Sequence, residues 1–155
     1  MTDLVYFEDV QVGDTHRFGQ YAVTREEIIE YARQFDPQPF HLDEEAAKKS
    51  MFGGLIASGW HTGAMLIRML CDHAIPGSAT TGALGFDDLK WLKPVRPGDI
   101  LSVETEVREK TESRSRPDIG VVKIASRVHD QRGETKMTLV SLVLYRRRSA
   151  RPAAG

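Results

Sequence analysis

Residues 60–73 constrain the fold more than any other segment, because they predict a long helix with few polar positions. Apolar side chains cover most of its circumference, at Ala64, Met65, Leu66, Ile67, Met69, Leu70 and Cys71. A helix that is apolar nearly all round is normally buried, so the lone Cys71 is expected in the core. Arg68 and Asp72 lie four positions apart on the one polar strip, which predicts an ion pair.

The second half of the chain predicts a sheet that could bury this helix. Strand patterns fall at 84–92, 101–107, 122–128 and 137–145. Turn-forming residues follow the first of these strands at 94–99 and the third at 130–133, and a polar loop is expected at 111–118. The last strand is apolar on both faces, which predicts a central, covered position.

Helices and strands in separate blocks predict an α+β fold. An antiparallel sheet wrapped around the 60–73 helix is the simplest arrangement that buries it. The length of 155 residues suits one domain, expected over 1–147, with a solvated tail over 148–155. An open sheet edge needs covering or pairing, which predicts a homodimer or a higher homo-oligomer.

An earlier helix is expected to deliver Asp36 at its C-terminal end. Thr24 and Glu27 have the spacing of a capping box, in which the Thr24 hydroxyl accepts from the Glu27 N–H and the Glu27 carboxylate reaches back. Ile28, Ala32 and Phe35 form its apolar stripe.

Two prolines follow, so residues 36–41 are expected to be extended and irregular. Asp43 is then expected to cap a short helix over 44–50.

Asp36 and His41 are the candidate acid–base pair, since a carboxylate and an imidazole brought together could share one water. Gly59 is the candidate oxyanion donor. Ser58 or Gly59 begins the 60–73 helix, and a helix start presents free N–H groups and a positive dipole end. The alternatives are a loop histidine, an Asx-turn aspartate and a packing glycine.

The Asp36, Pro39, Phe40, His41 motif resembles the MaoC-like (R)-specific enoyl-CoA hydratases, or hydratase 2, whose pattern is Gly-Asp-x-Asn-Pro-aliphatic-His. Phe35, Gln38 and Phe40 depart from it. The run 53–59 resembles the second block of the family, in which a glycine amide at a helix start holds the thioester oxygen. The serine of the family on the next helix falls near Ile67, which cannot hydrogen-bond.

The resemblance covers about residues 7–145 and implies a hot-dog fold, pairing into dimers and cofactor-independent hydration of trans-2-enoyl-CoA to (R)-3-hydroxyacyl-CoA. It implies catalytic roles for Asp36, His41 and Gly59, with Asp36 as the preferred base and the reverse assignment open. Substrate contacts are expected from Phe40, Gly54, Ser58 and Trp60. A hot-dog acyl-thioester hydrolase and a non-catalytic acyl-thioester binding module are the alternatives.

Composition and charge indicate which classes of binding partner are not expected. The net charge of −1 gives no support for nucleic-acid or membrane binding. The single cysteine allows no intramolecular disulfide, which fits the cytoplasm. No His, Cys, Asp and Glu cluster has metal-ligand spacing, so no metal or cofactor is expected. His61 is interpreted as a polar residue in the first turn of its helix, and His16, His73 and His129 as structural or surface residues.

Overall fold

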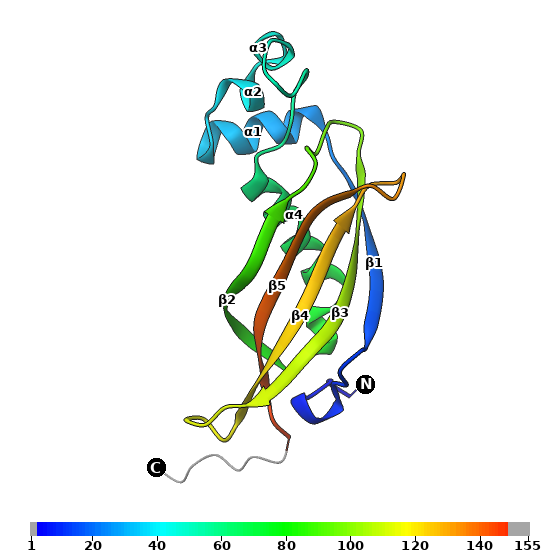
Figure 1. Ribbon diagram of the computed structural model, residues 1–155, viewed down its shortest axis with the longest axis vertical. Coiled ribbons are helices and arrows are strands. Elements are labelled where there is room, and N and C mark those ends of the chain that lie inside the picture. The colour runs from blue at the N-terminus through cyan, green and yellow to red at the C-terminus, as the bar shows by residue number, and fades with distance from the viewer. Residues whose placement is uncertain (1–2, 149–155) are drawn as a thin grey trace.

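The computed structural model describes residues 3–148, which form an elongated antiparallel sheet with one long helix packed along it (Figure 1). The strands are β1 (Thr15–Ala22), β2 (Thr80–Trp91), β3 (Ile100–Glu112), β4 (Ile119–His129) and β5 (Thr135–Arg146). The helices are α1 (Arg25–Phe35), α2 (Pro39–Leu42), α3 (Glu44–Lys48) and α4 (Gly59–His73), with 3-10 turns η1 (Phe7–Asp9) and η2 (Ile75–Gly77). Among these helices, none is both long and apolar enough to span a membrane.

The sheet order is β1-β3-β4-β5-β2, with every neighbouring pair antiparallel. The predicted hot-dog arrangement is confirmed, since β3, β4 and β5 form a meander and α4 runs along one face of the sheet. The predicted central place of the last strand is also confirmed, because β5 lies between β4 and β2. The two edge strands are β1 and β2. The polar loop is shorter than predicted, because β3 continues to Glu112.

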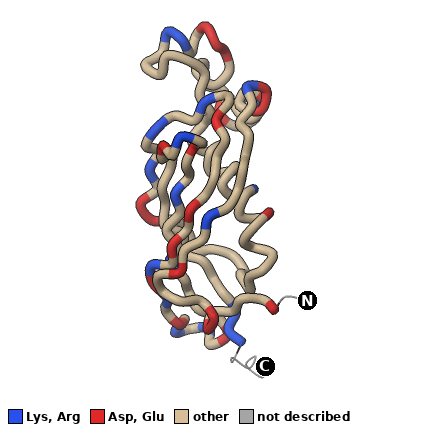
Figure 2. The backbone as a smooth tube through the Cα atoms, turned by 90° about the vertical axis from the view of Figure 1, so that its right-hand side faces the viewer, with Lys and Arg blue, Asp and Glu red and all other residues tan. Residues whose placement is uncertain are grey.

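Helix α4 is buried on one side only. Its buried residues include Met65, Leu66 and Met69, which belong to one core cluster with apolar side chains of the sheet. Ile67 is 46% exposed and Cys71 is also exposed. In the single chain, the predictions of all-round burial of the helix and of a cysteine in the core are therefore wrong. The reason is that the sheet covers a single face of the helix, as the side view shows (Figure 2). Arg68 and Asp72 form the predicted ion pair at 3.0 Å.

The start of α1 confirms half of the predicted capping box. The Glu27 N–H donates to the Thr24 hydroxyl at 3.2 Å. The Glu27 carboxylate, however, does not return to Thr24, because it accepts a hydrogen bond from the Tyr21 hydroxyl and lies 3.4 Å from the Nε2 atom of His61. Glu27 therefore connects α1 to β1 and to α4.

The proline-rich segment is more regular than predicted. Pro39 begins the four-residue helix α2, because a proline at the first helical position needs no N–H and has a suitable φ. His41 thus lies in a helical turn. Asp43 accepts from the Ala46 N–H at 2.9 Å, as predicted, although α3 ends at Lys48.

The last described residue, Arg148, is exposed and ion-paired. Its guanidinium lies 2.7 Å from the Asp9 carboxylate, and it is the first residue of the predicted solvated tail. The rest of that prediction, 149–155, lies outside the described residues.

Candidate active site

Asp36 and His41 meet where α1 gives way to α2. Asp36 is the C-cap of α1, and its N–H donates to the Ala32 carbonyl oxygen at 2.9 Å. His41 is 4% exposed. The Asp36 Oδ2 and His41 Nε2 atoms are 3.4 Å apart. The two residues singled out by their spacing in the sequence are therefore brought together.

The ring orientation of His41 is fixed from its other side. Its Nδ1 atom lies 2.7 Å from the carbonyl oxygen of Ile56. A carbonyl oxygen can only accept, so Nδ1 carries a proton and donates it. The Nε2 atom is then the one turned toward Asp36. In the neutral ring this atom has a free lone pair, and in the imidazolium it carries the exchangeable proton.

The surroundings of Asp36 favour its carboxylate form. Burial raises the pKa of this carboxyl, but the Ser58 hydroxyl, the Gln38 amide and the His41 imidazole together lower it below its ordinary value. The Gln38 side-chain amide donates to Asp36 Oδ1 at 2.6 Å. Ser58 is close enough to influence Asp36, yet its buried Oγ makes no hydrogen bond of normal geometry within the described residues.

Gly59 is the first residue of α4, with Ser58 as its N-cap. Its carbonyl oxygen accepts from the Trp91 indole N–H at 2.9 Å. Its own N–H has no acceptor among residues 3–148, as expected in the first turn of a helix. Ser58 does not supply a side-chain cap. The predicted helix start is thus confirmed, and the Gly59 N–H at this start is a free backbone donor within the described residues.

A cavity of about 380 Å³ joins these groups, lined by Asp36, His41 and Gly59. Its remaining lining is mainly apolar and includes four aromatic side chains, Phe40, Phe52, Trp60 and Trp91. A mainly apolar cavity with a few convergent polar groups is the usual form of a small-molecule site.

Three of the four predicted substrate-binding residues line this cavity, namely Phe40, Ser58 and Trp60. Gly54 does not line it. A Cβ at Gly54 would instead lie 3.2 Å from the guanidinium of Arg96, which donates to the Phe52 carbonyl oxygen. Gly54 therefore lies beside Arg96, which holds the backbone of Phe52 in the cavity wall, and is not part of the lining itself.

The sequence interpretation missed the contribution of the end of β2 and of the residues that follow it. Trp91, Lys93 and Val95 also line the cavity. The available signal was a tryptophan near the end of the 84–92 strand pattern, but only the sheet register brings it to Gly59. Within residues 3–148, no group of three or more His, Cys, Asp or Glu side chains is arranged to hold a metal ion.

Comparisons with known proteins agree with this fold. Residues 9–147 match the family model described as MaoC like domain. The chain is 35% identical over 115 residues to the 3-hydroxybutyryl-CoA dehydratase of Methylorubrum extorquens, covering 73% of this chain and 70% of that protein. It is 28% identical over 125 residues to the uncharacterized protein YdeM of Bacillus subtilis, covering 81% of this chain and 87% of the relative.

A solved structure is similar along almost its entire length. The MaoC-like dehydratase from Rhodospirillum rubrum is 44% identical, with a TM-score of 0.85, and the match covers 94% of this chain and 99% of that one. The family match over most of the chain, together with this structural likeness, establishes that the protein belongs to the MaoC-like dehydratase family.

Proposed function

We propose that this protein catalyses the reversible hydration of trans-2-enoyl-CoA thioesters to (R)-3-hydroxyacyl-CoA thioesters without a cofactor. The observation that carries the proposal is the 3.4 Å approach of Asp36 Oδ2 and His41 Nε2 on a cavity that also receives the free end of α4. The similarity to a 3-hydroxybutyryl-CoA dehydratase supports the reaction class. The stereochemistry follows the resemblance to (R)-specific hydratases.

In the proposed reaction, one water molecule lies between Asp36 and His41. The Asp36 carboxylate takes a proton from this water as its oxygen attacks the β carbon, and the protonated Nε2 of His41 gives a proton to the α carbon. Asp36 is then neutral in charge and His41 has lost its Nε2 proton. Transfer of a proton from the Asp36 carboxyl back to His41 restores the starting pair, so the protons balance over one turnover.

The Gly59 N–H is the proposed donor to the thioester oxygen. Negative charge develops on this oxygen when the β carbon is attacked, and a preorganised backbone donor stabilises that charge. The carboxyl of Asp36, with a pKa lowered below its ordinary value, is ionised near neutral pH, as a base must be, although the lowered pKa also makes it a weaker base. The aromatic lining of Phe40, Trp60 and Trp91 suits an apolar acyl group.

A panel of trans-2-enoyl-CoA thioesters tests this function. Hydration is expected to remove the absorbance of the conjugated enoyl group without releasing a free thiol, and chiral analysis should give the (R) product. Asp36→Asn and His41→Ala should each lower turnover by about 10² to 10⁴-fold, the usual contribution of general acid–base groups. Release of thiol without hydration would instead identify a hydrolase, and near wild-type turnover in either variant would refute the acid–base pair.

We further propose that the protein is a homodimer, paired along β2, and that it acts in the cytoplasm. β2 is a sheet edge whose Leu84 is 66% exposed and Phe86 51% exposed. An exposed apolar edge strand needs a partner. The mass in solution at micromolar concentration should be that of two chains, and Phe86→Lys should yield monomers. A wild-type monomer would refute the pairing.

A further inference from the structure

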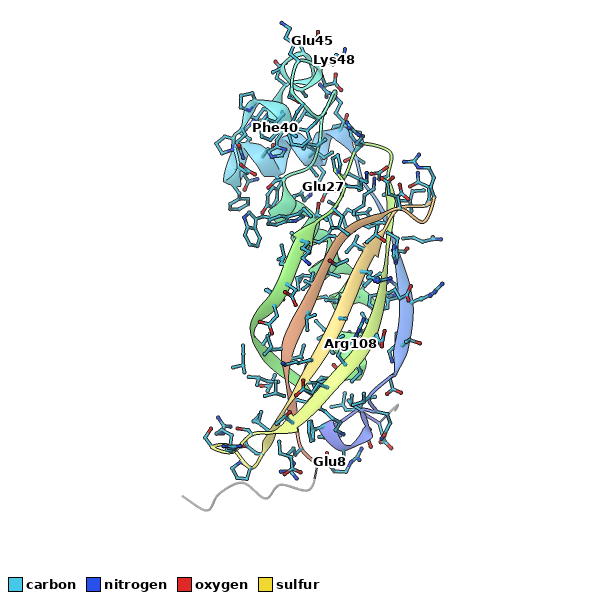
Figure 3. All side chains as sticks on the ribbon, in the orientation of Figure 1. Glu8, Glu27, Phe40, Glu45, Lys48 and Arg108 are labelled. Carbon is cyan, nitrogen blue, oxygen red and sulfur yellow. The ribbon has the colours of Figure 1, made fainter. Side chains whose placement is uncertain are left out.

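A partly buried polar cluster lies outside the candidate active-site cavity, between α1, α4 and β1. His61, the third residue of α4, is 2% exposed. Its ring stacks on Tyr31 of α1 with centroids 4.5 Å apart and an interplanar angle of 6°. Its Nε2 lies 3.4 Å from Glu27 Oε1, and the same oxygen accepts from the Tyr21 hydroxyl of β1. Figure 3 labels Glu27 below α1, on the side of α4 and the sheet.

The cluster joins the two helices that carry the proposed chemistry. Glu27 and Tyr31 lie on α1, which ends by delivering Asp36 as its C-cap. His61 lies two residues after Gly59, at the start of α4. A movement of His61 relative to α1 would therefore change the distance between the acid–base pair and the backbone donor.

The cluster does not touch the proposed substrate cavity. Tyr21, Glu27, Tyr31 and His61 line a second cavity of about 310 Å³, and none of them is among the residues that line the first cavity. Any effect of these side chains on the reaction must then pass through the position of the helices.

The contacts of the Tyr21 hydroxyl and the His61 ring indicate where each of them carries its proton. Burial, with the hydrogen bond to Glu27, raises the pKa of Tyr21 to about 12, so its hydroxyl keeps its proton and donates. Burial lowers the pKa of His61, although Glu27 opposes this effect. The neutral ring has one N–H, and the carboxylate beside Nε2 assigns the proton to that atom.

If His61 served only to fill space, it would destabilise the fold more than an apolar ring. Its buried Nδ1 has no hydrogen-bond partner among the described residues. A buried nitrogen without a partner destabilises a fold, and an apolar ring could stack on Tyr31 without that cost. The imidazole adds one thing that such a ring lacks, the polar contact with Glu27.

We propose that Tyr21, Glu27 and His61 are positioning residues that hold the first turn of α4 against α1. This clamp sets the Gly59 N–H at the distance from Asp36 that the reaction needs. The expected effect on kcat rests on the proposed hydratase function. The attachment of α4 to α1 rests on the contacts alone. Misplacement of a reacting group by about 1 Å can cost about 10²-fold in rate.

The test compares four variants by kinetics and by amide hydrogen exchange. Glu27→Ala and His61→Phe remove the polar contact, and Glu27→Gln keeps a carbonyl oxygen that can accept from both partners. Glu30→Gln is the matched control, because Glu30 lies on the same helix and cavity but pairs with Arg33 at 2.6 Å.

Glu27→Ala and His61→Phe should lower kcat by about 10 to 100-fold with KM changed less than about threefold, because only the placement of the donor is altered. Both variants should also speed exchange of the amides at 62–65, the first hydrogen-bonded turn of α4, relative to wild type. Glu27→Gln should recover most of kcat, and Glu30→Gln should match wild type in both measurements.

The outcomes separate this clamp from the hydratase function. Unchanged exchange in both Glu27→Ala and His61→Phe overturns the clamp, whether or not the wild type turns over enoyl thioesters. Faster exchange with unchanged kcat, or with a raised KM alone, overturns the positioning role while the hydratase stands. Faster exchange in the two variants, together with a wild type that turns over no enoyl thioester, supports the clamp and removes the proposed function.

Discussion

The indole N–H of Trp91 donates to the carbonyl oxygen of Gly59 at 2.9 Å, so the last residue of β2 binds the first residue of α4. The same indole packs so closely on Gly59 that no side chain fits between them. The strand thus fixes the backbone that carries the proposed oxyanion donor, while Trp91 itself contributes to the wall of the cavity.

Gly59→Ala is expected to destabilise the protein. An ideal Cβ at this position lies 2.4 Å from the Trp91 ring, so the ring or the helix must shift. Overpacking of this kind costs about 1 to 3 kcal/mol in the free energy of unfolding. Gly63→Ala is the matched control on the same helix, because a Cβ there meets nothing within 4 Å. It should stabilise by about 0.5 to 1 kcal/mol, since alanine is the better helix former. Urea unfolding measures both, and equal effects would contradict the close approach of Trp91.

Trp91→Phe should weaken the attachment of β2 to α4. The variant loses the hydrogen bond to Gly59, a loss of about 0.5 to 1.5 kcal/mol in unfolding free energy. Trp60→Phe serves as the control for reduced ring size, because Trp60 is 62% exposed and packs edge-on against Trp91. If Trp60→Phe costs as much as Trp91→Phe, the hydrogen bond is not what holds the helix start.

Asp36→Asn should destabilise the protein near neutral pH but not in acid. The pKa of Asp36 is lower in the folded protein than its ordinary value of 3.8, so ionised Asp36 contributes stability above pH 3.8. This contribution disappears as the pH falls through the folded pKa. The difference between wild type and Asp36→Asn should therefore shrink when unfolding is measured from pH 7 down to pH 3. Asp72→Asn, on the exposed side of α4, controls for the loss of one charge.

The stability of the wild type should fall in mild acid because of His61. Burial lowers the pKa of His61 below 6.5, so the unfolded chain takes up this proton first as the pH falls. Glu27, Tyr31 and His41 are the titratable groups around the ring, and Glu27 opposes the shift without cancelling it. His61→Phe should lose less stability than the wild type between pH 7 and pH 5. Parallel curves for the two proteins would show that His61 titrates normally.

Lys136→Met should be strongly destabilising. The Lys136 ammonium is buried, 3.5 Å from both Asp99 and Asp130, and donates to the Pro94 carbonyl oxygen at 3.1 Å. Its removal leaves Arg132, 3.2 Å from both aspartates, as their remaining ion-pair partner and takes a hydrogen bond from the Pro94 oxygen, which together should cost about 3 kcal/mol. Lys123→Met is the matched control, since its pairing with Glu109 at the surface contributes about 0 to 1 kcal/mol. A small effect of Lys136→Met in thermal unfolding would show that water reaches the two aspartates.

The elements of the fold were predictable because their signals are local. The alternation at Leu101, Val103 and Val107 predicts a half-buried strand, and the glycine after Ser58 predicts a helix start. Asp36 and His41 were found for the same reason, since a helix end and two prolines bring them together over five positions.

The long-range contacts were not predictable from these patterns. Trp91 reaches Gly59 across 32 positions, through the register of β2 on β5. Glu27 meets His61 across 34 positions, so the local capping-box pattern gave the wrong partner for its carboxylate. The one-sided cover of α4 also escaped prediction, because a sequence shows which positions are apolar but not which of them the same chain will cover.

The uncovered side of α4 has a kinetic consequence. Trp60 is exposed there and Trp91 is 45% exposed, yet both line the candidate active-site cavity. A second chain that covered these indoles would supply part of the outer wall of this cavity. Activity per chain would then depend on protein concentration, falling on dilution into the range where the chains separate. Substitutions far from Asp36 and His41, on the contact between chains, would alter substrate preference as readily as those inside the cavity.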